Sequence, residues 1–130
     1  MEIEAVPRKA ELTLRVAGVG ELELTLSGDA LGTYRAMAES QRRLDAEAEE
    51  LRRRCSTDDK VEAGTAMLQY MVRTGDIQLE AIRTALDADA WAKLEAIADR
   101  LPVPTISRIH AAIAQLAVEA LVSDLKEGRS

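Results

Sequence analysis

Hydrophobic and polar residues alternate strictly near the start of the chain. Apolar side chains occupy every even position of two short runs, with polar or charged residues between them: Leu12, Leu14 and Val16, then Leu22, Leu24 and Leu26. A period of two is typical of strands with one buried face. Residues paired across two strands lie on the same face, so the loop between the strands must contain an odd number of residues. We place this loop at residues 17–19, which sets Arg15 opposite Glu21. The pattern predicts an antiparallel β-hairpin over residues 11–26.

After Asp29 the spacing becomes that of helices. A long helix is expected over residues 30–55, beginning at the turn Ser27-Gly28-Asp29 and ending in a basic triplet that favours the helix dipole. Its apolar stripe alternates steps of three and four, which is heptad spacing. The stripe positions are Tyr34, Met37, Gln41, Leu44, Ala48, Leu51 and Cys55.

Shorter helices are expected in the rest of the chain, over residues 60–73, 77–86, 88–101 and 104–126. Asp59, Asp76 and Asp87 are suitable N-caps, Gly75 marks the end of the first of these helices, and Pro104 suits a first helical turn. The chain is expected to form a single domain over residues 1–130. Its fold class is mostly α with a small N-terminal antiparallel hairpin (α+β): residues 11–26 form the hairpin, 30–55 the long helix and 60–127 a compact bundle of shorter helices.

Charge and composition narrow the classes of partner. The net charge is −6, which disfavours phosphate backbones and anionic lipids, so we expect neither a nucleic-acid nor a membrane partner. Gln115 and Glu119 interrupt the most apolar stretch, and the start MEIEAVPRKA lacks the pattern of a signal peptide. The single cysteine fits a reducing compartment. We therefore expect a cytoplasmic protein.

The candidates for chemistry are few. His110 is the only histidine and Cys55 the only cysteine, so a Cys–His pair is conceivable, but a packed histidine explains the residue more simply. Asp87 and Asp89 could bind a cation, although helix capping and first-turn charge account for both. Residues 28–32 lack the length and the Lys-Ser/Thr ending of a phosphate-binding loop. We expect no enzyme activity, no metal and no cofactor.

Two features of the long helix could contact other molecules. The basic residues Arg42, Arg43 and Arg52–Arg54 could touch phosphates, but the surrounding glutamates favour a solvated face. The heptad stripe either packs against helices of its own chain or docks a helix of another chain. In the second case the candidate partner-binding residues are Tyr34, Met37, Gln41, Leu44 and Leu51.

Two segments resemble the tail assembly chaperones of long-tailed bacteriophages and their prophage relatives. They are LTLRVAGVGELELTLSGDALGTYRAM and LEAIRTALDADAWAKLEAIADRLPVPTISRIHAAIAQLAVEAL, more than half of the chain. The second is similar to the pattern Leu-x-x-Asp/Glu-x-Trp/Tyr-x-x-Leu of that family, here at Leu86, Asp89, Trp91 and Leu94. The scarcity of aromatic residues departs from the family.

The resemblance implies a small, acidic, non-enzymatic protein in the host cytoplasm. Proteins of that family coat the helical tape-measure protein, help recruit tail-tube subunits and are often also made in a longer, frameshifted form. It therefore implies protein partners and a homo-oligomer, since many weak contacts along a polymer act by avidity. The alternative is an oligomeric bacterial adaptor or regulatory protein-binding module.

Overall fold

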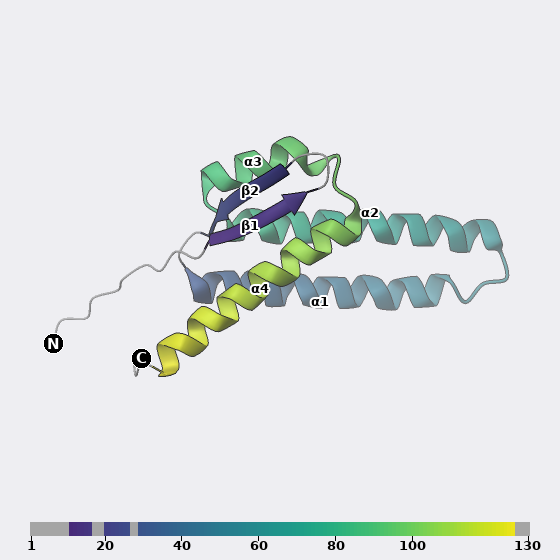
Figure 1. Ribbon diagram of the computed structural model, residues 1–130. Helices are drawn as coiled ribbons and strands as arrows, with labels where there is room; N and C mark the ends of the chain where they lie inside the picture. Colours follow the sequence, from purple (N-terminus) through teal and green to yellow (C-terminus); the bar gives the residue numbers. More distant parts are fainter. Residues whose placement is uncertain (1–10, 17–19, 27–28, 127–130) are drawn as a thin grey trace.

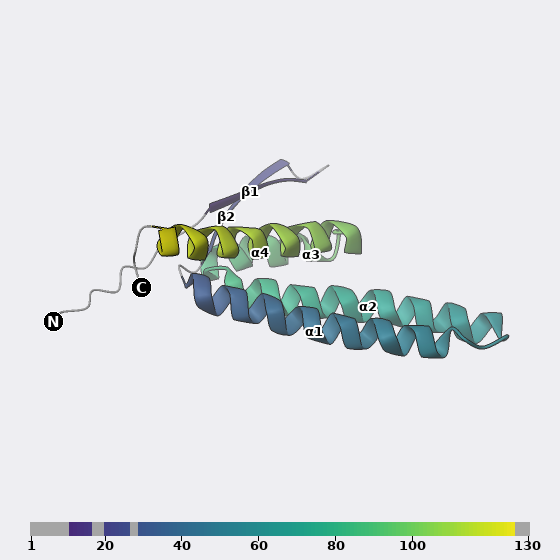
Figure 2. The same ribbon diagram turned by 90° about the horizontal axis from the view of Figure 1, so that it is seen from below.

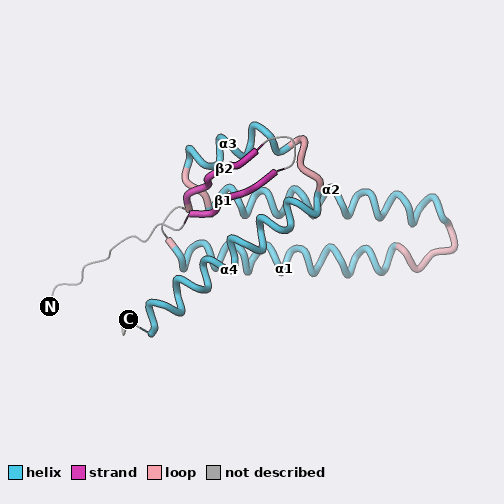
Figure 3. Tube along the Cα trace, viewed as in Figure 1, coloured by secondary structure: helices cyan, strands magenta, loops and turns pink. Residues whose placement is uncertain are grey.

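The computed structural model describes residues 11–16, 20–26 and 29–126. It contains two short strands and four helices: β1 Glu11–Val16, β2 Gly20–Thr25, α1 Ala30–Arg54, α2 Lys60–Ala85, α3 Ala88–Ala98 and α4 Val103–Lys126. Helices make up most of the chain (Figure 3). The expectation of a mostly helical protein is therefore confirmed.

The strands β1 and β2 pair antiparallel, with Leu12 opposite Leu24 and Arg15 opposite Glu21. The Arg15 and Glu21 side chains form an exposed ion pair of 3.0 Å. The loop expected at residues 17–19 lies outside the described residues, as do the side chains of Leu12, Leu14, Val16 and Leu22. The described apolar side chains of the second run, Leu24 and Leu26, are buried in the core. An aliphatic face therefore does face the helices where it can be followed.

The chain folds into three layers (Figure 2). The strand pair lies on one side, α3 and α4 form the middle layer, and α1 and α2 lie on the other side. The core between them is aliphatic, and its most deeply buried large side chains are Leu24, Ile82, Leu94 and Ile113. Two backbone contacts join the strand pair to the turn between α2 and α3. The Asp87 amide donates to the Thr25 carbonyl (3.0 Å), and Leu26 forms an isolated antiparallel β-bridge with Leu86.

Aspartate side chains begin three of the helices. Asp29 accepts from the Gly32 amide (2.9 Å), Asp59 from the amides of Val61 and Glu62, and Asp87 from the Ala90 amide (2.8 Å). Each bond satisfies an amide that has no partner within its helix. The helix starts expected at residues 30, 60 and 88 are confirmed.

The expected break at Gly75 is wrong, and so is the separate helix expected from residue 77. The helix α2 runs without interruption from Lys60 to Ala85. Gly75 is buried, and a Cβ built on it would lie 3.6 Å from a methyl carbon of Val103 on α4. A glycine costs a helix only about 1 kcal/mol, which burial of the neighbouring residues Ile77 and Ile82 outweighs. Asp76 is therefore an interior residue of α2 and caps nothing.

The prediction that every helix after residue 60 is shorter than the first helix is consequently wrong. With 26 residues, α2 is as long as α1, and the two lie side by side as an antiparallel pair (Figure 1). Their far halves, joined through residues 55–59, extend beyond α3 and α4 (Figures 1 and 2). We call this projecting part the arm.

Truncation of the core at Leu94 tests this packing. Leu94 is fully buried in the aliphatic core, so Leu94→Ala should lower the free energy of unfolding by about 2–5 kcal/mol. Urea denaturation followed by circular dichroism measures the change. Lys93→Ala, at the exposed neighbouring position, is the control and should change it by less than about 0.5 kcal/mol. Equal effects of the two changes would contradict the assigned core.

Candidate protein-binding face

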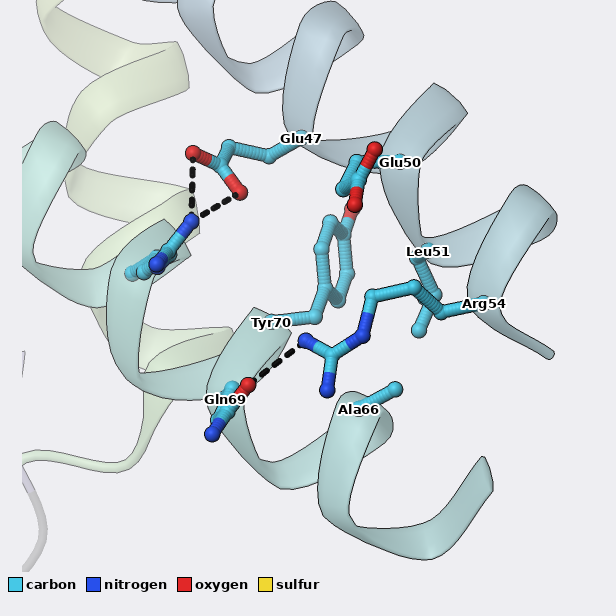
Figure 4. Close-up of a pocket in the computed structure, with 8 residues that line it drawn as sticks. Glu47, Glu50, Leu51, Arg54, Ala66, Gln69 and Tyr70 are labelled. Atoms are coloured by element: carbon cyan, nitrogen blue, oxygen red, sulfur yellow. Dashed lines mark hydrogen bonds and ion pairs between the residues drawn. The ribbon is translucent and has the colours of Figure 1, made fainter. Parts of the chain in front are cut away.

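Polar contacts and a narrow apolar seam hold the two helices of the arm together. Arg73 on α2 forms an ion pair with Glu47 on α1 (3.2 Å), and Arg54 donates to Gln69 (2.6 Å) (Figure 4). Between these contacts the Tyr70 side chain points from α2 toward α1. The cavity at the seam is only about 10 Å³, room for about one water molecule. The seam therefore holds the arm together and has no room for a ligand.

The outward side of α2 in the arm is apolar and uncovered. Only one of the twelve residues from Val61 to Val72 is charged, and that residue is Glu62. Five large apolar side chains there are 45% to 78% exposed, and we call them the α2 strip: Val61, Met67, Leu68, Met71 and Val72. At roughly 100 Å² each they present on the order of 500 Å² of apolar surface, a size at which patches are often functional.

The α2 strip continues a face that is buried in the other half of the same helix. Gly64, Leu68 and Met71 lead, in heptad steps, to Gly75, Gln78 and Ile82. Those last three residues are buried, and α4 lies over them: Val103 sits against Gly75, and Ser107 donates to the Gln78 side chain (2.9 Å). A helix of this chain covers one half of the face, and no described residue covers the other half. The uncovered half is therefore the exposed apolar continuation of a surface that α4 covers elsewhere on α2.

The structure separates the residues expected to bind a partner. Met37 and Leu44 are 3% and 7% exposed, so they pack within their own chain, which is the first of the two alternatives for the α1 stripe. Leu51, like the stripe residues Ala48 and Cys55, is half-buried in the arm.

The remaining two face solvent. Tyr34 is 44% exposed near the start of α1, and Gln41 is exposed and donates to Asp45 (3.0 Å). The five side chains do not form one continuous exposed surface.

Sequence reasoning missed the α2 strip itself. The expected break at Gly75 made the helix look too short to have an uncovered half. A usable signal was present, because the stretch VEAGTAMLQYMV carries a single charge in a protein whose residues are 31% charged. A helix segment of that composition is usually buried rather than exposed.

The basic residues of α1 are mostly engaged by acids. Arg42 pairs with Glu39, Arg52 with Glu49 and Arg53 with Glu50, each one helical turn away. The hydrogen bond from Arg53 lowers the pKa of the Glu50 carboxyl.

Two further arginines of α1 contact α2. Arg43 pairs with Glu80 (3.1 Å), and Arg54 donates to Gln69. This arrangement fits the solvated-face interpretation better than a phosphate site.

His110 is buried in α4 and bonded to α1. Its Nε2 lies 2.7 Å from Ser40 Oγ, and both side chains are at most 6% exposed. The Ser40 hydroxyl also lies 2.7 Å from the Met37 carbonyl, and when it donates there the ring donates to Ser40 from Nε2. The pair is a buried polar contact that joins α4 to α1.

The other chemical candidates are not brought together. Cys55 ends α1 at the tip of the arm, far from the crossing of α1 and α4 where His110 lies (Figure 1). Asp87 is occupied as a helix cap, and Asp89 is exposed beside it. Among the described residues, no three acidic, histidine or cysteine side chains gather where they could hold a metal ion.

The helix α4 is more apolar than expected. Within the described chain it is the one helix whose length and mean hydropathy (1.2) would suffice to cross a membrane, despite Gln115 and Glu119. That finding is weak, because a core helix passes the same test, and α4 supplies Ile106, Ile109 and Ile113 to the core.

The chain matches no known family model, no curated protein and no solved structure.

Burial of His110 predicts a loss of stability in mild acid. Burial lowers the pKa of His110 below the ordinary value of 6.5, because the charged ring would lose its hydration. As the pH falls through 6.5, the His110 ring becomes protonated in the unfolded chain but stays neutral in the folded chain. The free energy of unfolding therefore decreases. Above pH 6.5 the ring is neutral in both states, and protonation of His110 no longer affects the free energy of unfolding.

Thermal melting between pH 7.5 and 5.0 measures this effect. His110→Gln, which keeps a hydrogen-bonding side chain and cannot titrate, is the control and should show a smaller decrease over that range. Because His110 is the only histidine, a decrease of the same size in both proteins would contradict the assignment.

Proposed function

We propose that this protein is a non-enzymatic assembly chaperone or scaffold of the phage-tail type. In this proposal it binds a long helical protein, such as a tape-measure protein, helps recruit tail-tube subunits and works as a homo-oligomer in the host cytoplasm. The strand pair is proposed to close as a hairpin through residues 17–19, which gives the α+β fold of the resemblance.

One observation carries the proposal: the apolar face of α2 is covered by a helix in one half and bare in the other. A bare face of this kind fits helix-in-groove recognition, in which an apolar helix face is laid on a hydrophobic surface. The intramolecular contact of α4 with Gly75 and Gln78 is the pattern that such a partner helix would extend toward the arm tip.

The composition of the α2 strip suits a partner of repetitive sequence. It contains two methionines, Met67 and Met71, whose flexible side chains adapt to different surfaces. It is also uncharged, so it does not select a partner by charge pattern. A long helical polymer offers many similar apolar faces, and many copies bound with modest affinity would hold it by avidity.

A matched pair of variants tests the binding face. Val72→Lys places a charge in the α2 strip, whereas Val122→Lys places the same charge at another exposed valine, on α4. Burying an unpaired lysine is costly, so Val72→Lys should weaken binding of the helical partner by at least about tenfold, and Val122→Lys by less than about twofold.

The measurement begins with a search of the neighbouring reading frames for a long helical protein, which is then co-expressed with this one and titrated as a purified component. Several copies bound along one helical partner would support the proposal. One copy bound to a single segment would favour the adaptor alternative. The absence of any long helical reading frame near the gene, or equal binding by the two variants, would contradict the proposal.

A further inference from the structure

We infer that in the free protein the α2 strip is covered by the α2 strip of a second copy. The two α2 helices would run in opposite directions and cross about a two-fold axis at Leu68, at the angle of about 50° at which rows of residues four apart pack together. This inference does not depend on the identity of any helical partner, because it concerns the protein alone.

A row of five residues in α2, each four positions after the last, is complementary to itself. The row consists of Lys60, Gly64, Leu68, Val72 and Asp76. Residues four apart form one ridge on a helix surface, and all five are exposed. When a second copy is turned about Leu68, Lys60 meets the partner's Asp76 and Gly64 meets the partner's Val72. A two-fold contact requires this kind of self-complementarity, with no like charges opposed.

Gly64 has no role within its own chain that explains it. A Cβ built on Gly64 would have no atom within 4 Å, so a side chain would fit without strain. Yet a glycine inside an exposed helix costs about 1 kcal/mol relative to alanine. Close approach of another helix is a usual reason for such a glycine, and the partner's Val72 side chain fits the gap.

The surface area is sufficient for a dimer. Two α2 strips together expose on the order of 1,000 Å² of apolar surface, which equals the lower limit for a specific interface when the contact covers both strips. The row also leads away from the part of α2 that α4 covers: Gly75 and Gln78 are buried under α4, whereas Asp76 and Glu80 are exposed. The arm projects beyond α3 and α4, so a second arm has room beside it (Figure 2).

Such a dimer would cover the apolar α2 strip until a helical partner displaces the second copy. An uncovered patch of this size promotes aggregation, and pairing removes it from water. Partner binding and dimer formation would then compete for the same face.

Charge reversal tests the register. Light scattering over a concentration series should show a mass of twice 14.2 kDa for the unaltered protein at high concentration. Lys60→Glu and Asp76→Lys should each weaken the dimer by about three- to tenfold, because each opposes like charges at two symmetric places. The double variant should restore it to within about twofold. A strict monomer up to about 1 mM, or no restoration by the double variant, would overturn the inference.

Cross-linking tests the axis. In a Cys55→Ser background, Leu68→Cys places two thiols next to each other on the two-fold axis and should give a disulfide-linked dimer under mild oxidation. Val122→Cys in the same background is the control and should stay largely uncross-linked. Cross-linking at residue 122 but not at 68 would overturn the inference, while loss of the dimer with intact partner binding would overturn it and leave the proposed function standing.

Discussion

Packing along one face of α2 is the constraint on which the structure depends. In its second half this face carries Ile82 and Ala85 into the core, together with residues of β2, α3 and α4. The burial there is large enough to keep the helix continuous through Gly75. Because the helix does not stop, its first half is extended outward with α1, and the arm is the result.

Backbone and side-chain hydrogen bonds join the elements that surround this face of α2. The Asp87 amide bonds to the Thr25 carbonyl, so the strand pair is fixed to the turn between α2 and α3. A pair of strands is marginally stable in isolation, and here Leu24 and Leu26 gain the apolar support that it needs. The Ser40–His110 contact fixes α4 across α1 on the opposite side. These contacts join the strand pair to the α2–α3 turn and α4 to α1. In the arm, the described polar contacts between helices join α1 and α2.

Charge is distributed to suit this division. On α1 the arm is dense in arginine and glutamate, which pair with each other along the helix and across to α2. On the outward side of α2 charge is almost absent between Val61 and Val72. Surface ion pairs contribute little to stability, so the α1 side keeps the arm hydrated and the α2 side supplies its capacity to bind. Both the proposed helical partner and the proposed second copy follow from that asymmetry.

The sequence by itself determined the features that depend on local chemistry. Alternation gave the register in which Arg15 faces Glu21, and capping aspartates gave the starts of α1, α2 and α3. These interactions join residues within a few positions of each other or across one pair of strands, so periodicity and side-chain type suffice to find them.

Tertiary structure decided the length of α2 and the location of the bare face. Whether Gly75 ends a helix depends on what lies against it, and Val103 comes from a distant part of the chain. For the same reason the heptad stripe of α1 became partly core, through Met37 and Leu44, while the uncovered strip arose on α2. The free energy of burial is set by which segments meet, and a one-dimensional pattern shows which residues are apolar without showing which of them are covered.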